Sequence, residues 1–124
     1  MYILDTFAWV ELFKKTEKGA KVFELIKSSP CFTSSISIAE ISYWCEENRI
    51  GRKAQLDYAK SLSRIIDADH QILELAGVLK AEKRKTAGSD FGLVDAIILA
   101  TGRMHGLQLV TGYPHFKNEN VLML

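Results

Sequence analysis

The chain has 124 residues, a formal net charge of +1 at pH 7, 48% hydrophobic residues and 25% charged residues. These values are ordinary for a globular protein, so we expect a single domain that spans residues 1–124. A net charge this small excludes binding to nucleic acid through bulk charge, and any such attraction must come from local patches. Because the sequence contains neither an apolar run of membrane-spanning length nor a signal peptide, we expect no membrane association and a cytoplasmic location.

The first half of the chain predicts two buried strands, each followed by helices. Strands are expected at residues 2–4 and 31–33, where short apolar runs end at polar residues. Helices are expected at residues 8–13, 18–27, 36–48 and 54–62. Thr6 is expected to cap the first helix, and Phe23 to point inward from the second.

The second half predicts strands at residues 63–66, 107–110 and 121–124. Asp69 is expected to cap a helix over residues 70–85, in which apolar residues recur at i, i+3, i+4 and i+7. Four basic residues lie near the far end of this helix: Lys80, Lys83, Arg84 and Lys85. They form either a solvated helix end, favoured by the helix dipole, or a cationic edge for an RNA backbone.

The stretch from Leu93 to Ala100 is apolar except for Asp95. A helix drawn here is apolar on all sides, so we expect it to be largely buried. An unpaired buried carboxylate costs several kcal/mol, on the order given for buried ions, so Asp95 needs a partner. That partner is either the N-terminus of its own helix or a metal cation. Asp90, in the preceding loop, either caps this helix or takes part in a metal site.

Strands that alternate with helices predict a parallel sheet with helices on both faces. In such folds the working crevice lies outside the carboxyl ends of the strands. Asp5 and Thr111 fall at two such ends, and Glu40 and Asp95 lie near the starts of helices that rise from the same edge. We therefore expect acids that are far apart in the sequence to converge.

Three carboxylates in one crevice repel each other, and a hard divalent cation relieves the repulsion. Oxygen ligands alone indicate Mg²⁺ or Mn²⁺. The sequence has no glycine-rich phosphate loop and no nucleophile elbow. A cation on carboxylates suits the hydrolysis of phosphodiester bonds.

Four short motifs occur in order along the chain: residues 3–6 (ILDT), 37–41 (SIAEI), 92–101 (GLVDAIILAT) and 109–116 (LVTGYPHF). They resemble the motifs of PIN-domain ribonucleases, and most closely those of VapC-type toxins from prokaryotic toxin–antitoxin pairs. The resemblance implies a PIN-like three-layer α/β/α sandwich with a mostly parallel sheet. It also implies an endoribonuclease that depends on Mg²⁺ or Mn²⁺, forms homodimers and is neutralised by an antitoxin protein.

By the same resemblance, Asp5, Glu40 and Asp95 match the first three acids of the family and are expected to bind the metal directly or through water. Thr111 matches a hydroxyl position beside the site, and Thr6 is expected to support Asp5. The position of the family's fourth acid is occupied by Tyr113. Because a phenol is protonated near neutral pH, it is a poor ligand for Mg²⁺.

This departure leaves three interpretations open. The site keeps one metal on three acids, Asp90 or Glu119 replaces the missing acid, or the site has lost activity. Two functions follow: a metal-dependent endoribonuclease, with a toxin as its biological role, or an inactive PIN domain that binds RNA or a protein. A nucleotide-binding domain is a third hypothesis, and the lack of a glycine-rich first turn speaks against it.

Overall fold

The carboxyl ends of parallel strands form the edge on which the candidate site is built. The computed structural model describes residues 1–87, 90–116 and 118–124. Within these residues the sheet has five strands in the order β3-β2-β1-β4-β5, and every neighbouring pair is parallel. The strands are β1 (Tyr2–Leu4), β2 (Cys31–Ser34), β3 (Arg64–Ile66), β4 (Gln108–Thr111) and β5 (Val121–Met123). β1, which precedes Asp5, is hydrogen-bonded to β4, which ends at Thr111.

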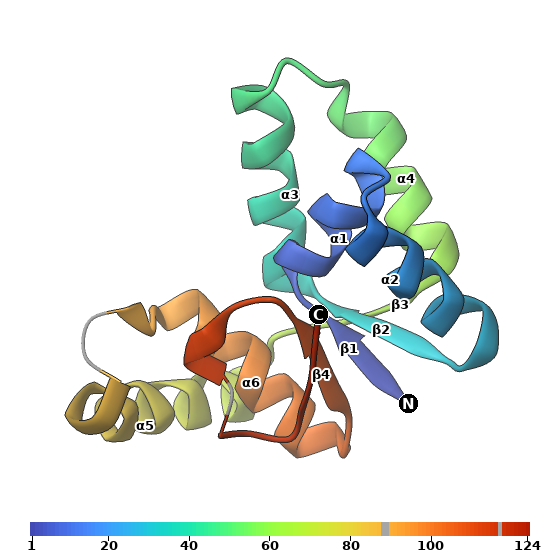
Figure 1. The fold of residues 1–124 in the computed structure, drawn as a ribbon. Coiled ribbons are helices and arrows are strands. Elements are labelled where there is room, and N and C mark those ends of the chain that lie inside the picture. The colour runs from blue at the N-terminus through green and yellow to red at the C-terminus, as the bar shows by residue number, and fades with distance from the viewer. Residues whose placement is uncertain (88–89, 117) are drawn as a thin grey trace.

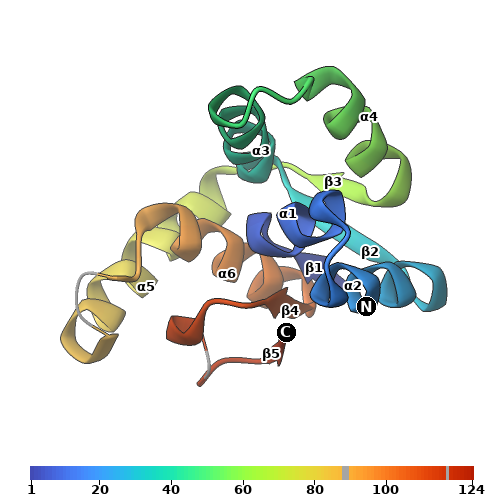
Figure 2. The same cartoon turned by 45° about the horizontal axis from the view of Figure 1, so that its top comes forward.

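Helices cover both faces of the sheet, as Figures 1 and 2 show. They are α1 (Thr6–Lys14), α2 (Glu17–Ser28), α3 (Ser35–Glu47), α4 (Arg52–Leu62), α5 (His70–Ala87) and α6 (Leu93–His105). Buried residues of α1 to α4 pack with Leu4 and Val110, whereas those of α5 and α6 pack with Ile3 and Leu109. Neighbouring residues of a strand point to opposite faces, so each strand contributes to both cores. The predicted three-layer sandwich is confirmed, and the sheet is entirely parallel.

The predicted burial of the last helix is confirmed. Every residue of α6 from Ala96 to Gly102 is buried, and the helix ends at Gly106 with a φ of 64°, the left-handed conformation that favours glycine at this position. Asp69 caps α5 as predicted, because its Oδ1 accepts a hydrogen bond from the amide of Ile72 at 3.0 Å.

Three local predictions are wrong. Asp5, not Thr6, caps α1, and Thr6 is the first residue of that helix. Gly92, not Asp90, is the N-cap residue of α6. The side chain of Phe23 is 37% exposed rather than directed inward. Within the described ranges, none of the helices combines the length and the apolar character that crossing a bilayer requires.

Gly19 lets α2 pack closely against α1. A Cβ atom at Gly19 would lie 2.2 Å from the carbonyl oxygen of Glu11, so Gly19→Ala is expected to lower the free energy of unfolding by about 1–3 kcal/mol. Gly77→Ala is the matched control on α5, because a Cβ atom there would have no neighbour within 4 Å beyond the local backbone of its own helix. It should raise stability by about 1 kcal/mol through helix propensity. Urea unfolding measures both, and a Gly19→Ala chain as stable as wild type would contradict the close helix contact.

Candidate active site

Asp5 leaves the sheet at the end of β1 and is almost completely buried, with 1% of its surface exposed. Its Oδ1 accepts a hydrogen bond from the amide of Ala8 at 2.9 Å, which caps α1. Its Oδ2 is buried and has no hydrogen-bond partner among the described residues. A buried carboxylate oxygen without a partner is costly and marks a position where a cation would be stabilised.

The surroundings of Asp5 disfavour its charge. Burial raises its pKa from 3.8 to about 7, against the opposing effects of the nearby Thr111 hydroxyl and of the hydrogen bond from the Ala8 amide. The charges of Asp95 and Glu40 raise this pKa further. The three predicted acids are therefore close enough to interact electrostatically at the carboxyl edge of the sheet.

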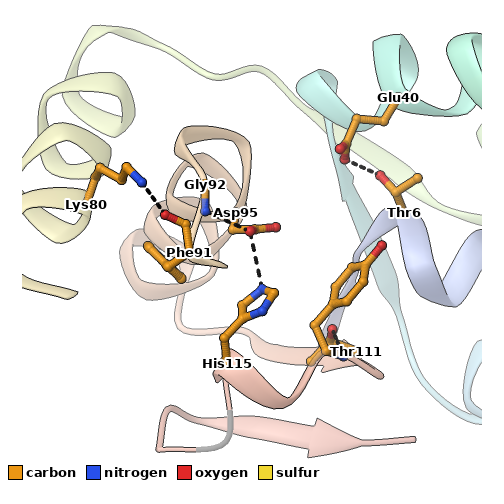
Figure 3. Close-up of polar contacts among 9 residues, drawn as sticks. Thr6, Glu40, Lys80, Phe91, Gly92, Asp95, Thr111 and His115 are labelled. Atoms are coloured by element: carbon orange, nitrogen blue, oxygen red, sulfur yellow. Dashed lines mark hydrogen bonds and ion pairs between the residues drawn. The ribbon is translucent and has the colours of Figure 1, made fainter. Parts of the chain in front are cut away.

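Glu40 lies on α3 and is held by α1. The Thr6 hydroxyl donates a hydrogen bond of 2.5 Å to Glu40 Oε1 (Figure 3). Burial raises the pKa of Glu40, the hydrogen bond from Thr6 opposes this, and the charge of Asp95 raises it again. Thr6 therefore contacts Glu40 rather than Asp5, which it was predicted to support.

Asp95 is the third residue of α6, and the helix N-terminus is one of its partners, as predicted. Its Oδ2 accepts a hydrogen bond from the amide of Gly92 at 3.0 Å. The Nε2 atom of His115 lies 3.2 Å from the same oxygen, as Figure 3 shows. Sequence reasoning missed His115, although it belongs to the last of the four motifs. The second predicted partner, a cation, remains a prediction.

The fold explains why these acids meet. α6 ends just before β4 begins, so the last turn of α6 lies at the edge where β4 starts. Its first turn therefore lies at the opposite edge, where the parallel strands β1 and β4 both end. However, no group of three or more His, Cys, Asp or Glu side chains is placed to hold a metal ion among the residues that the structure describes. Glu40 and Asp95 are turned toward Thr6 and His115 instead. The acids converge without forming a ready set of ligands.

Tyr113 lies among the acids at the position of the family's fourth acid. Its ring stacks on His115 at a centroid distance of 5.3 Å and meets the edge of Phe7 at 5.1 Å. Burial raises the pKa of Tyr113, as do the charges of Asp5, Glu40 and Asp95. The phenol is therefore neutral at pH 7, and its ring lies near all three carboxylates.

Asp90 and Glu119 are the suggested substitutes for the missing fourth acid. Asp90 is exposed and does not cap α6. Glu119 forms ion pairs with Lys83 and with Arg103. Arg103 follows Asp95 by eight residues in α6, which corresponds to about 12 Å along the helix. Glu119 therefore lies at the opposite end of α6 from the acids.

The basic run of α5 divides into two parts. Lys80 Nζ donates a hydrogen bond of 2.5 Å to the carbonyl of Phe91, just before α6 (Figure 3). Lys83 is paired with Glu119, and its ammonium lies 5.7 Å from the Phe91 ring centroid. Arg84 and Lys85 are exposed. Lys80 thus supports the start of α6, whereas Lys83 is held by Glu119. The RNA-binding role predicted for the whole run is left as a prediction.

Lys80→Met is expected to lower the free energy of unfolding by about 1–3 kcal/mol, because it removes a charged hydrogen bond to Phe91, whose side chain is fully buried. Lys85→Met is the matched control at an exposed position and should change stability by less than about 0.5 kcal/mol. Chemical denaturation of both variants measures the difference. Equal stabilities would show that Lys80 does not support the start of α6.

Comparison with known proteins agrees with the geometry. The sequence model of the PIN domain matches residues 2–118. A toxin–antitoxin complex from Klebsiella pneumoniae has a TM-score of 0.78 at 24% identity, covering 99% of this chain and 97% of that one. VapBC2 from Rickettsia felis, bound to a promoter DNA fragment, has a TM-score of 0.76 at 25% identity, covering 99% and 96%.

A third similar structure is VapC20 of Mycobacterium tuberculosis, described as a toxin that cleaves the Sarcin-Ricin loop. Its TM-score is 0.66 at 18% identity, covering 88% of this chain and 87% of that one. No curated protein matches the sequence. The family match spans nearly the whole chain, and the Klebsiella pneumoniae and Rickettsia felis structures each cover 99% of it. The chain therefore belongs to the PIN-domain family, and its fold is similar to that of chains in toxin–antitoxin and VapBC complexes.

Proposed function

We propose that this chain is an endoribonuclease that depends on Mg²⁺ or Mn²⁺ and is the toxin of a toxin–antitoxin pair. One observation carries the proposal: Asp5, Glu40 and Asp95 converge at the carboxyl edge of the sheet, and one oxygen of the most buried acid has no partner. Family membership supports nuclease chemistry at this edge.

The residues present fit a hard divalent cation. The unpartnered Oδ2 of Asp5 is buried, and the groups around it are carboxylates and the Thr111 hydroxyl. Oxygen donors of this kind suit Mg²⁺ and Mn²⁺. Asp5, Asp95 and Glu40 would hold the cation. When bound, it would supply positive charge to the scissile phosphate and lower the pKa of an attacking water.

The remaining residues orient the acids. Thr6 holds Glu40 through its hydroxyl, and the Gly92 amide holds the carboxylate of Asp95, next to which His115 Nε2 lies. For Glu40 and Asp95 to share a cation with Asp5, both side chains would have to turn away from these partners. Tyr113 supplies no fourth charge, so we propose one metal on three acids.

The biological partners are part of the same proposal. Toxin–antitoxin complexes from Klebsiella pneumoniae and Rickettsia felis share the fold, which supports an antitoxin protein as the partner of this chain. The VapC20 toxin is described as cleaving the Sarcin-Ricin loop, which supports RNA as the substrate class of this chain. We further propose that the chain acts in the cytoplasm as a homodimer.

The test of substrate class compares RNA and DNA of one sequence. Purified chain is incubated with each strand, folded as the same hairpin, in the presence of Mg²⁺ or Mn²⁺. Internal cuts in the RNA alone are expected. Equal cleavage of DNA would contradict the assignment to RNA, and an absence of cleavage of both strands would contradict the nuclease.

Tyr113 favours a second candidate, a PIN domain that binds RNA without cutting it, because it removes the fourth acid. This function predicts RNA binding that weakens steeply with salt, with no cleavage at any metal concentration.

A further inference from the structure

A pocket lies next to the three acids of the candidate active site. This pocket of about 310 Å³ lies between α1 and α3, and Thr6, Glu40 and Tyr113 line one part of it. These three residues also belong to the candidate active site. A larger groove of about 550 Å³ is formed by α1, α2 and α4, and its lining residues include none of the three acids. The smaller pocket is therefore the one continuous with the proposed chemistry.

Aromatic rings form much of the wall of this pocket. Phe7, Tyr43, Trp44 and Tyr113 line it together with aliphatic and charged side chains. Tyr43 is 68% exposed and Tyr113 is 38% exposed, so both present ring surface to solvent. Next to a nucleic-acid site, exposed rings of this kind stack on bases, because every base has a π face.

Positive charge lies at the other end of the pocket. Lys14 lines it eight residues after Thr6, which is about 12 Å along α1. Its ammonium lies 3.3 Å from a carboxylate oxygen of Glu11, and its side chain is 53% exposed. The Glu11 side chain is only 13% exposed, so Lys14 stays beside it, and the exposed half of Lys14 is the part that can face a phosphate. Lys18 places a second ammonium near the start of α1, 5.4 Å from the ring centroid of Phe7.

We propose that this pocket binds one unpaired nucleobase of the RNA substrate, adjacent to the scissile phosphate. The base stacks on the rings of Tyr43 and Trp44, and a neighbouring phosphate lies near Lys14. The inference rests on the proposed nuclease function and names its substrate class, which is RNA with a single-stranded or extrahelical nucleotide beside the cut. A base inside an A-form helix is paired and stacked and does not reach a recessed pocket, whereas a splayed base does.

Tyr43 allows a clean test because it is mostly exposed and its side-chain hydroxyl bonds to Glu47 on the same helix. The substrates are a cleavable RNA and versions with one abasic ribonucleotide at each position beside the cut. For wild type, removal of one particular base is expected to lower kcat/KM about 5- to 100-fold, the range for loss of one stacked base. Tyr43→Ala should lower kcat/KM similarly on intact RNA and add little to the abasic effect.

Two control variants accompany the comparison of Tyr43→Ala with base removal. Tyr43→Phe keeps the ring and should restore wild-type kcat/KM. Tyr58→Ala removes another exposed tyrosine, which lines the larger groove, and should leave kcat/KM and the effect of base removal unchanged. The proposal would be overturned if base removal left kcat/KM unchanged at every position. It would also be overturned if the effects of Tyr43→Ala and of base removal on kcat/KM were fully additive. The pocket would then be open to a protein segment rather than a base.

A binding measurement separates this inference from the nuclease function. RNA that carries 2-aminopurine at the position beside the cleavage site, or at each loop position if no site is found, is titrated with the chain in EDTA. Quenching by wild type that Tyr43→Ala weakens would support the pocket even if no cleavage occurs. Cleavage without such quenching would leave the nuclease intact and overturn the base-binding pocket.

Discussion

Asp5→Asn is expected to abolish Mn²⁺ binding and to lower the rate of RNA cleavage by at least about 100-fold. Asp5 is the most buried of the three acids, and its Oδ2 is the oxygen that lacks a partner. An amide has nearly the same shape, but it carries no charge and places an N–H₂ group or a neutral oxygen where the cation would bind. The measurements are calorimetric titration with Mn²⁺ and the initial rate of RNA cleavage.

Asp90→Asn is the matched control for this variant. Asp90 is an exposed acid five residues before Asp95, and its side chain does not cap α6. If three acids suffice, Asp90→Asn should keep Mn²⁺ affinity and cleavage within about twofold of wild type. A loss as large as that of Asp5→Asn would restore Asp90 as the substitute for the missing fourth acid. Retention of more than a tenth of the activity by Asp5→Asn would contradict the role of Asp5.

Asp5→Asn is also expected to stabilise the metal-free protein at high pH. Burial raises the pKa of Asp5 to about 7 in the folded chain, from 3.8 without burial. The stability that this group contributes is therefore fully present below about pH 4 and is lost as the pH rises through 7. Asn avoids the cost of the buried charge and remains a good N-cap for α1. At pH 8 the gain in the free energy of unfolding is expected to approach, at most, about 4 kcal/mol.

Urea unfolding in EDTA at pH 4.5 and pH 8 measures this effect. The variant should exceed wild type at pH 8, and the difference should nearly vanish at pH 4.5. A difference that does not change with pH would show that packing, rather than charge, separates the two proteins. Mn²⁺ should reverse the order at pH 8, because it stabilises only the chain that binds it.

The parts of the fold that follow from local pattern were predictable. The apolar run from Leu93 to Ala100 predicts the buried α6, and Asp69 predicts the start of α5. The alternation of strands and helices predicts the parallel sheet, and the sheet brings Asp5 and Thr111 to one edge. Glu40 and Asp95 follow from their places near the starts of helices that rise from the same edge. These inferences need only the periodicity of each element and the geometry of parallel strands.

The contacts that the sequence did not predict join residues far apart in the chain. Asp5 and Thr6 are adjacent, and both residue types cap helices, so only the turn out of the sheet decides between them. His115 meets Asp95 across twenty positions, and Thr6 meets Glu40 across thirty-four. Such pairs depend on how helices pack on the sheet, which residue spacing does not reveal. The same packing creates the pocket between α1 and α3.

The most direct test of the central claim, that three acids hold a cation that cuts RNA, is a single cleavage experiment. A labelled RNA pool is incubated with wild type and with Asp95→Asn, each in a Mn²⁺ titration and in EDTA. Internal cleavage is predicted only for wild type with Mn²⁺. Cleavage that persists in Asp95→Asn or in EDTA would contradict the claim. So would a wild-type chain that neither cuts RNA nor gains thermal stability from Mn²⁺, and the RNA- or protein-binding function would then replace the nuclease.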